Sequence, residues 1–396
     1  MIVFVDGVGV KSNCFSKVFK TGMCACVLGA CSFGWSLYET KHPKVREYDL
    51  NILPEDADPV RVLHISDLHY RGEKSKWLAN WFKKLDISNI DFVISTGDHM
   101  GADNVKNDVV NMLEKCLSKP GAFVFGSNDY YGPKKKNPFK YFWSKSPVNS
   151  NSTDGNYFIN KVAVKNKTPN VILDSQGLAD SLVSKGWVNL NNSCACIDLP
   201  QGRIELIGLD DPHISRDCFP DITKLSEIDS CENINSKELS VDPCEKLNNE
   251  NMGDNSLIDS DNLAHDNVSR ETPRKILARI GVAHAPYLSV ISKFAKAGCA
   301  LSCFGHTHGG QLCVPFFGAL VSNCDLPPVF ASGMFSLREI FSYVNFLGLS
   351  SVDFAKKLEN KNGFVSISAG LGVAPMLPLR FACRPEVSVI NLCPKK

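Results

Sequence analysis

Short apolar runs alternate with amphipathic segments along much of the chain. Two segments, Ser75–Leu85 and Val105–Leu117, repeat their apolar residues at the three- and four-residue spacing of a helix. The apolar runs beside them have the length of buried strands, and they are Arg61–Ser66, Phe92–Thr96 and Ala122–Phe125. Strands that alternate with helices in this order predict a parallel sheet covered by helices, with ligands bound at the carboxyl ends of the strands.

The second half of the chain carries further strand patterns. The predicted strands are Trp187–Leu190, Cys194–Leu199, Arg203–Leu209, Ile276–Ala283, Cys299–Phe304, Gly363–Ala369 and Pro385–Leu392. Helical spacing recurs in Leu178–Lys185 and Tyr287–Ala297. Because the first three of these strands follow one another without a helix between them, we expect this half to be rich in antiparallel pairs.

Residues 221–273 lack the pattern of a packed core. They are rich in Asn, Ser, Asp and Glu and contain almost no aromatic residues. Such a segment cannot bury enough apolar surface to offset the entropy lost on ordering, so we interpret it as a disordered insertion. The α/β domain is therefore expected to span residues 59–396 with this insertion inside it. Residues 131–167 form a polar and aromatic connection.

The N-terminal region, residues 1–58, differs from the rest. Residues 21–38 carry no charge, and basic residues flank them on both sides. An uncharged stretch of this length is close to the lower limit for a membrane-spanning helix, so we predict membrane association through this segment. A signal-peptide core and a helix packed on the domain are the alternatives.

Composition adds limits on partners and location. The chain has 43 Lys and Arg against 42 Asp and Glu, so its net charge of +1 shows no basic excess that would indicate nucleic-acid binding. It has 16 cysteines, several in apolar runs, and no Cys-x-x-Cys pair, which argues against a zinc ribbon. This cysteine usage favours a reducing compartment, so apart from the membrane segment we expect a cytoplasmic protein.

Polar residues able to bind metal ions follow five of the apolar runs. They are Asp67, His69, Asp98, Asn128, His284, His306 and His308. His306 and His308 lie in a glycine-rich turn, and a loop at a strand end can direct both rings at one point. Each residue alone has an ordinary explanation, such as a helix cap or a buried core histidine. Together they predict a metal cluster at the ends of the strands.

The chemistry of these ligands indicates the kind of cluster. Carboxylate, imidazole and amide groups suit two hard or borderline divalent ions, such as Mn, Fe or Zn. A carboxylate bridging two ions holds them about 3.5–4 Å apart, a spacing used in hydrolysis at phosphorus. Such a pair activates water and neutralises the phosphoryl oxygens. The carboxylate-rich set disfavours a purely structural zinc site.

Five motifs in this chain resemble those of the calcineurin-like metallophosphoesterases. They are Asp67-Leu68-His69, Gly97-Asp98, Ser127-Asn128-Asp129, His284 and Gly305-His306-Thr307-His308. The resemblance extends from about residue 60 to residue 392, and it looks closest to the membrane-associated bacterial branch, in particular the actinobacterial members. It implies a four-layer αββα sandwich, an α/β fold with two mixed sheets flanked by helices.

The resemblance also implies a role for each residue of the cluster. The first metal would be held by Asp67, His69, Asp98 and His308. The second would be held by Asp98, Asn128, His284 and His306, with Asp98 bridging. The residues implied in catalysis are Asp98, Asn128, Asp129 and His306.

One position departs from the family pattern. The third motif usually ends in a histidine that contacts the phosphate and can protonate the leaving group, and Asp129 occupies that place here. An ionised Asp cannot donate a proton near pH 7, so Asp129 would instead orient a water, a neighbouring residue or a substrate hydroxyl. His99 and His213 are candidate replacements, and a structural role is the alternative for both. We expect Asn128, Asp129 and His213 to contact the substrate.

The sequence therefore predicts a metal-dependent phosphoester hydrolase that acts on a phosphodiester or a lipid-linked phosphate. The alternative is a non-catalytic metal-bearing protein that binds a phospho-ligand, which the departure at Asp129 leaves open. The expected partners are the phosphoester substrate and a membrane contacted through residues 21–38.

Overall fold

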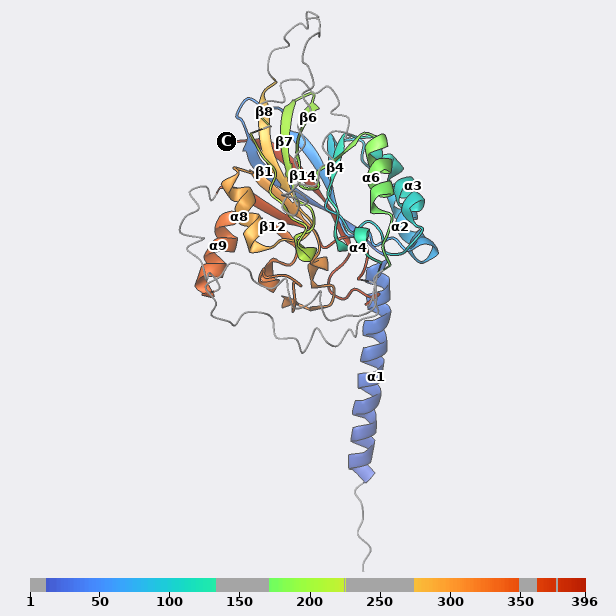
Figure 1. Ribbon diagram of the computed structural model, residues 1–396. Helices are drawn as coiled ribbons and strands as arrows, with labels where there is room; N and C mark the ends of the chain where they lie inside the picture. Colours follow the sequence, from blue (N-terminus) through green and yellow to red (C-terminus); the bar gives the residue numbers. More distant parts are fainter. Residues whose placement is uncertain (1–11, 133–170, 224, 226–273, 349–361, 375–376) are drawn as a thin grey trace, which may run out of the picture.

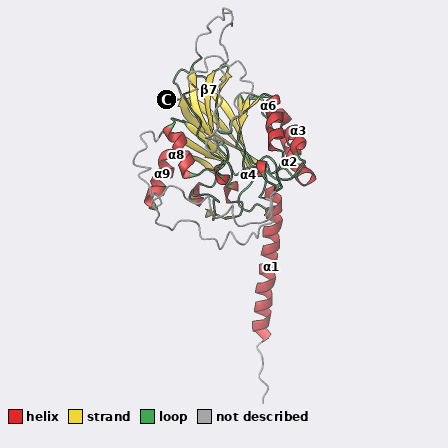
Figure 2. Ribbon diagram, viewed as in Figure 1, coloured by secondary structure: helices red, strands yellow, loops and turns green. Residues whose placement is uncertain are grey.

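Two six-stranded sheets face each other, and helices cover their outer faces (Figure 1, Figure 2). The computed structural model describes residues 12–132, 171–223, 225, 274–348, 362–374 and 377–396. The predicted four-layer sandwich with two mixed sheets is therefore confirmed. The expected disordered insertion at 221–273 and the connection at 131–167 lie almost entirely outside the described residues.

The first sheet has the strand order β1-β14-β2-β3-β4-β5. Its strands are β1 (Lys44–Leu53), β2 (Val60–Ile65), β3 (Phe92–Ser95), β4 (Gly121–Phe123), β5 (Trp187–Asn189) and β14 (Glu386–Pro394). The neighbours β2, β3, β4 and β5 are parallel, as the alternation of strands and helices predicts. β14 runs antiparallel to β2 and parallel to β1.

The second sheet has the order β12-β13-β9-β8-β7-β6. Its strands are β6 (Cys194–Leu199), β7 (Gly202–Gly208), β8 (Ile276–Val282), β9 (Leu301–Phe304), β12 (Gly333–Ser336) and β13 (Phe364–Ile367). Only the outer pairs, β6 with β7 and β12 with β13, are antiparallel. The expectation of an antiparallel-rich half was wrong, because long connections bring β7, β8, β9 and β13 side by side in parallel.

In the described part of the chain, five helices flank the sheets. They are α2 (Lys76–Lys84), α3 (Lys106–Leu117), α6 (Ser175–Ser184), α8 (Leu288–Lys296) and α9 (Leu337–Phe346). The first three pack on the first sheet, and α8 and α9 pack on the second. Smaller elements lie among the loops, namely α4 (Ser127–Tyr130), β10 (Cys313–Val314), β11 (Gly318–Ala319) and the 3₁₀ turns Gly72–Ser75, Pro212–Ile214, His308–Gly310 and Pro328–Phe330.

Apolar packing between the layers holds the sandwich together. Among the described residues, one cluster of buried side chains fills the space between the two sheets, and one lies under the helices on each outer face. Helix α2 buries Leu78 and Phe82, and α8 buries Val290 and Phe294, as their helical spacing predicts. Each such side chain contributes about 1.5–3 kcal/mol on burial, so the core places the strand ends rigidly.

Strand β1 changes the expected domain boundary. It lies inside residues 1–58, yet it pairs along its length with β14 near the C-terminus. Arg46 also forms an ion pair with the buried Glu386. The sheet therefore begins at residue 44 rather than after residue 58. The partner strand lies more than 300 residues away in sequence, which a local pattern cannot reveal.

Helix α1 (Ser12–Thr40) projects from the domain (Figure 1). Its C-terminal end is attached to the domain, because the Ser36 hydroxyl donates to the carbonyl of Arg380 at 2.8 Å and the Arg380 amide donates to Thr40 Oγ1 at 2.9 Å. Farther out, Val27, Leu28, Phe33 and other large apolar side chains are exposed. Within the described part of the chain, no helix is both long and apolar enough to cross a membrane.

Candidate metal centre

The seven residues predicted to bind metal lie at the carboxyl ends of strands from both sheets. Asp67 and His69 follow β2, Asp98 follows β3, Asn128 follows β4 in α4, His284 follows β8, and His306 and His308 follow β9. β2, β3 and β4 are parallel neighbours in the first sheet, and β8 and β9 are parallel neighbours in the second. The two sheets therefore bring their ends to one place.

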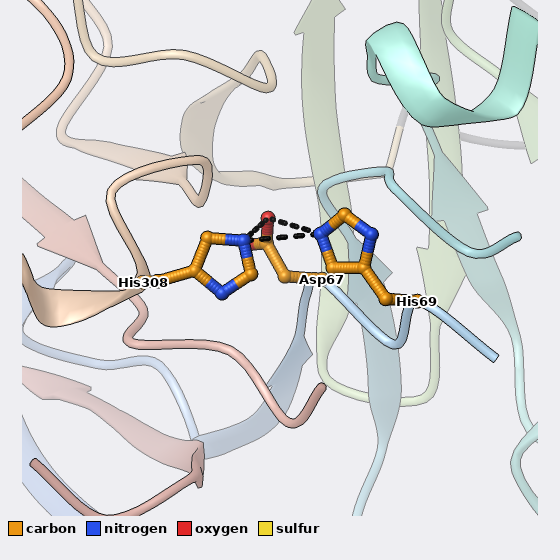
Figure 3. Close-up of side chains that lie close together, drawn as sticks. All are labelled: Asp67, His69 and His308. Atoms are coloured by element: carbon orange, nitrogen blue, oxygen red, sulfur yellow. Dashed lines mark hydrogen bonds and ion pairs between the residues drawn. The ribbon is translucent and has the colours of Figure 1, made fainter. Parts of the chain in front are cut away.

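Asp67, His69 and His308 form the first compact group (Figure 3). The Nε2 atoms of His69 and His308 are 3.0 Å apart. Asp67 Oδ1 lies 3.5 Å from Nε2 of His308 and 3.8 Å from Nε2 of His69. All three side chains are buried. Figure 3 shows them pointing toward one another, with Asp67 and His69 on the segment after β2 and His308 on the turn after β9.

Asp67, Asp98 and His284 form a second compact group, so the two groups share Asp67. Asp98 Oδ2 lies 3.4 Å from Nε2 of His284 and 3.3 Å from Nε2 of His69. Asp98 therefore also contacts one imidazole of each group. Both carboxylates occupy positions from which they can bridge two ions.

Asn128 and His306 lie beside the second group. The Asn128 side-chain amide donates to Asp98 Oδ2 at 2.8 Å, and its backbone amide donates to Asp98 Oδ1 at 2.8 Å. Rotating the side-chain amide by a half turn directs its oxygen to the same point. His306 Nδ1 lies 3.3 Å from Nε2 of His284. The structure thus brings all seven residues together.

The backbone at the ligands is strained. Five of the residues have φ in the left-handed region, with values of 49° for Asp67, 40° for His69, 54° for Asp98, 68° for His306 and 50° for His308. Residues other than glycine rarely adopt this conformation, which costs about 1–3 kcal/mol each. Strain of this kind concentrates at functional sites, where it aims side chains.

Two glycines allow the loops to approach each other. A Cβ on Gly305 would lie 1.9 Å from Ser66 Oγ and 2.4 Å from Asp67 Oδ2. A Cβ on Gly126 would lie 2.3 Å from Asp98 Oδ1. Any larger residue at these positions would push a carboxylate out of place, so each glycine is required for close contact rather than for a turn alone.

Burial and charge set the protonation of the site. Burial lowers the pKa of His69, His306 and His308, which keeps these imidazoles in the neutral form that binds metals. For Asp98, burial alone would raise the pKa, but His284 and His69 lower it overall. Asp98 is therefore held as a carboxylate, the form that a cation requires.

These residues fit divalent metal ions. Asp67 Oδ1 is buried and has no hydrogen-bond donor among the residues that the structure describes. A buried carboxylate oxygen without a partner is costly, and a cation between it and the two imidazoles would satisfy it. Carboxylates and neutral imidazoles suit Mn, Fe or Zn.

Neighbouring groups orient the ligands. His284 Nδ1 lies 2.7 Å from the carbonyl of Thr96, which can accept its proton and leave Nε2 free to bind a cation. Asp67 Oδ2 accepts hydrogen bonds from Ser66 Oγ at 2.6 Å and from the His306 amide at 3.0 Å. Oδ1 of the same carboxylate therefore faces the centre.

Arg380 supports His308, and sequence reasoning missed it. Its side chain is fully buried and donates to the carbonyls of Ala369 at 2.7 Å, Gly372 at 2.6 Å and His308 at 3.3 Å. Its guanidinium therefore joins the His308 turn to residues 369–372. An isolated Arg in an apolar stretch carries no motif that would single it out.

Asp129 does not take the place expected for it. Its side chain is fully buried, and its oxygens accept hydrogen bonds from the backbone amides of His99, Met100 and Gly126 at 2.8, 3.1 and 3.0 Å. It also contacts His99 Nδ1 at 3.1 Å. A carboxylate enclosed in this way cannot reach a substrate, which corrects the expectation of direct contact. Its contacts agree with the expectation that Asp129 orients a neighbouring residue, which here is His99.

His99 is likewise enclosed. It is fully buried, and its Nε2 lies 2.7 Å from Ser95 Oγ while Nδ1 faces Asp129. Both ring nitrogens are therefore used inside the fold, which rules out contact with a leaving group in this conformation. The geometry therefore favours a structural role for His99.

His213 has the opposite surroundings. Its ring is exposed, and it lies with its centroid 4.3 Å from that of the predicted ligand His306. Its Nδ1 is 3.0 Å from the hydroxyl of Tyr287. The preceding Asp211 is fully buried, and burial raises its pKa to about 7.

Comparison with known proteins agrees with the site. Residues 60–201 match the family model for calcineurin-like phosphoesterases. The uncharacterised metallophosphoesterase YkuE of Bacillus subtilis (strain 168) is 33% identical over 91 residues, which are 22% of this chain and 22% of YkuE. The match thus spans about a fifth of that relative's length.

Two solved structures show a low overall likeness. The phosphopantetheinyl hydrolase PptH from Mycobacterium tuberculosis has a TM-score of 0.28 and 10% identity, covering 65% of this chain and 84% of PptH. A 5′-nucleotidase precursor from Thermus thermophilus has a TM-score of 0.36 and 12% identity, covering 85% of this chain and 54% of the nucleotidase. The family match covers residues 60–201, which contain the first four predicted ligands, so this part of the chain is similar to the calcineurin-like phosphoesterases.

Proposed function

We propose that this protein is a phosphoester hydrolase with a binuclear metal centre at the seven clustered residues. The observation that carries this proposal is the convergence of Asp67, His69 and His308 within 3.8 Å, from loops of both sheets. Their backbone strain and burial support it, as does the family match. Bound divalent ions would supply an activated water and neutralise the phosphoryl oxygens.

The chain's own residues would hold and orient this chemistry. Asp98 contacts imidazoles of both groups, so we assign it as the bridging ligand. Asp67 belongs to both groups and is the alternative bridging ligand. Asn128 provides an amide beside Asp98 and remains our candidate for substrate contact. His306 lies between His284 and the exposed His213, at the boundary of the buried cluster.

We also propose that His213 contacts the substrate and serves the leaving group. It is exposed and lies against His306, whereas Asp129 and His99 are enclosed. Tyr287 contacts its Nδ1, which orients the ring beside His306. This arrangement would replace the histidine that the third motif lacks, using a residue from a different loop.

For the substrate, a phosphodiester or a lipid-linked phosphate remains our proposal. The exposed apolar side chains of α1 support the lipid part, because the helix projects from the domain and could lie on a lipid surface (Figure 1). A form that starts at Ser36 keeps the attached end of α1 and removes the outer turns. We expect the full chain to bind vesicles of anionic and neutral phospholipids and this form to stay in solution. Equal behaviour would contradict membrane association.

The central test is hydrolysis of an aryl phosphodiester by the purified chain with and without Mn²⁺. We expect turnover that depends on the added metal and disappears in Asp67→Asn. Metal binding without any turnover on monoesters, diesters or phospholipids would instead favour the alternative, a metal-bearing protein that binds a phospho-ligand.

A further inference from the structure

Two cysteines lie directly behind the turn that carries His308. Cys313 begins β10, and Cys383 lies on the segment before β14. The backbone holds these segments side by side, because the Cys313 amide donates to the carbonyl of Phe381 at 2.9 Å. Both cysteines are free thiols in the described part of the chain.

The two thiols share one acceptor. Cys313 Sγ donates to the carbonyl of Gly309 at 3.1 Å, and Cys383 Sγ lies 3.4 Å from the same oxygen. Cys383 Sγ also lies 3.4 Å from the carbonyl of His308. The sulfur atoms are therefore neighbours, at the backbone of a predicted metal ligand.

The packing at this turn is tight. A Cβ on Gly309 would lie 2.7 Å from Cys383 Sγ, so the sulfur fills the space that a side chain would take. The thiols are side-chain hydrogen-bond donors to this turn, and the His308 carbonyl also accepts from Arg380 at 3.3 Å and from the Gln311 amide at 3.0 Å. Any change at the sulfur atoms reaches the ligand through these carbonyls.

Small molecules can reach the thiols. A cavity of about 350 Å³ is lined by both cysteines and by Gly309, and charged side chains such as Lys44, Arg46 and Glu386 form part of its wall. By contrast, Cys299 and Cys303 are buried in the apolar core. The cavity gives this pair, rather than the core cysteines, access to a dissolved oxidant.

We propose that Cys313 and Cys383 are a redox-sensitive dithiol, which a hydroperoxide converts to a disulfide that weakens metal binding at the Asp67, His69 and His308 group. In the first step one sulfur attacks the peroxide, giving a sulfenic acid and releasing water or an alcohol. The second sulfur then attacks the sulfenic sulfur, forms the S–S bond and releases water. Two electrons and two protons pass from the thiols to the peroxide.

The physical consequence follows from the bonds that are lost. A disulfide has no S–H group, so the carbonyls of His308 and Gly309 lose these donors, and the sulfur atoms move together to a bond of about 2.05 Å. Loss of groups that orient a metal ligand typically costs about 10- to 100-fold in metal affinity. The effect on metal affinity rests on the proposed metal centre, whereas formation of the disulfide does not.

The test uses the full reduced chain treated with increasing hydrogen peroxide, followed by catalase, alkylation and mass spectrometry of its peptides. We expect a peptide pair linked through Cys313 and Cys383, and a Kd for Mn²⁺ that rises about 10- to 100-fold and returns after reduction. Cys383→Ser, whose hydroxyl can still donate to the same carbonyls, should lose both responses to peroxide. Cys393→Ser, a half-buried cysteine away from the turn, is the matched control and should respond like the wild type.

The outcomes separate the two proposals. Oxidation of other cysteines without the linked pair in the wild-type chain overturns the dithiol, even if the serine variant does not fold. A linked pair with an unchanged Kd for Mn²⁺ overturns the coupling to the metal. If the reduced chain binds no Mn²⁺, the proposed metal centre is wrong. The presence or absence of the linked peptide then still tests whether Cys313 and Cys383 form a disulfide.

Discussion

The two sheets bring different chemistry to the same centre. The first sheet supplies both carboxylates, the amide and one imidazole, namely Asp67, Asp98, Asn128 and His69. The second sheet supplies only imidazoles, namely His284, His306 and His308. The first sheet therefore provides the negative charge that cations need, and the second provides imidazole nitrogens as further ligands. Ions held between them would join the two halves of the sandwich.

Each sheet also orients a ligand of the other. The amide of His306, from the second sheet, donates to Asp67 at 3.0 Å. The carbonyl of Thr96, from the first sheet, lies 2.7 Å from Nδ1 of His284. Neither ligand set is therefore in place until the sheets have packed. Because a ligand that binds only the folded state stabilises it, metal binding should stabilise the whole sandwich.

The largest effect should come from removing a carboxylate of the first sheet. Asp98 contacts imidazoles of both groups, so we expect Asp98→Ala to lose about two equivalents of metal and nearly all turnover. His308→Ala, on the second sheet, should lose about one. Elemental analysis of the purified variants measures both. Equal losses would contradict Asp98 as the bridge, and a loss of two in Asp67→Ala alone would assign that role to Asp67.

The two sheets also differ in whether they offer a proton to the leaving group. If His213, in the loop after β7 of the second sheet, supplies this proton, His213→Ala should slow hydrolysis of alkyl phosphoesters by about 10²- to 10⁴-fold and affect aryl esters much less. Measuring kcat/KM for a matched aryl and alkyl pair tests this. His42→Ala, which removes an exposed histidine at the end of α1, is the control. Equal slowing of both esters would show that His213 only binds or positions.

A smaller effect is expected from Arg380, which is not a predicted metal ligand but contacts His308. Arg380→Met removes the donor to the carbonyls of His308, Ala369 and Gly372, so metal affinity should fall about 10- to 100-fold. Unsatisfied buried acceptors should also lower the free energy of unfolding by about 1–3 kcal/mol each. Metal titration and urea unfolding measure these effects. The exposed Arg384→Met should change neither, and an unchanged metal affinity in Arg380→Met would separate Arg380 from the site.

The smallest effect concerns stability against pH. His64 on β2 is fully buried between Ser366 and Thr96, and burial lowers its pKa to about 3. The unfolded chain takes up this proton near pH 6.5 and the folded chain does not, so stability is lost as the pH falls below 6.5. Between pH 6.5 and pH 5 the loss is about 2 kcal/mol.

Urea unfolding of the wild type and of His64→Gln at the two pH values tests this linkage. In the variant, the free energy of unfolding should fall by about 2 kcal/mol less between pH 6.5 and pH 5 than in the wild type. Groups at the metal centre titrate alike in both proteins and cancel in this comparison. The same slope with pH in both proteins would contradict the assignment.

Local patterns were enough to predict most strands, the helices α2, α3, α6 and α8, and the residues that end up at the centre. Apolar runs report burial directly, and a polar residue after such a run must lie at a strand end. Strand β1, helix α9 and the parallel order inside the second sheet were missed or misjudged. The two strand features depend on which strands become neighbours, and pairing between distant segments leaves no local period in the sequence. Helix α9 was missed although its buried residues, Leu337, Ile340, Phe341 and Val344, have helical spacing.

The ligand types, their order along the chain and the sandwich that their motifs imply can all be read from the residues alone. Packing of distant segments was needed to learn that Asp129 is enclosed by backbone amides, that His213 is exposed beside His306, and that Arg380 and two thiols lie behind His308. A residue's chemistry belongs to its side chain, whereas its access to solvent and its partners depend on segments brought to it by packing. Asp129 and Asp98 carry the same carboxylate, and only their surroundings separate a structural anchor from a candidate metal ligand.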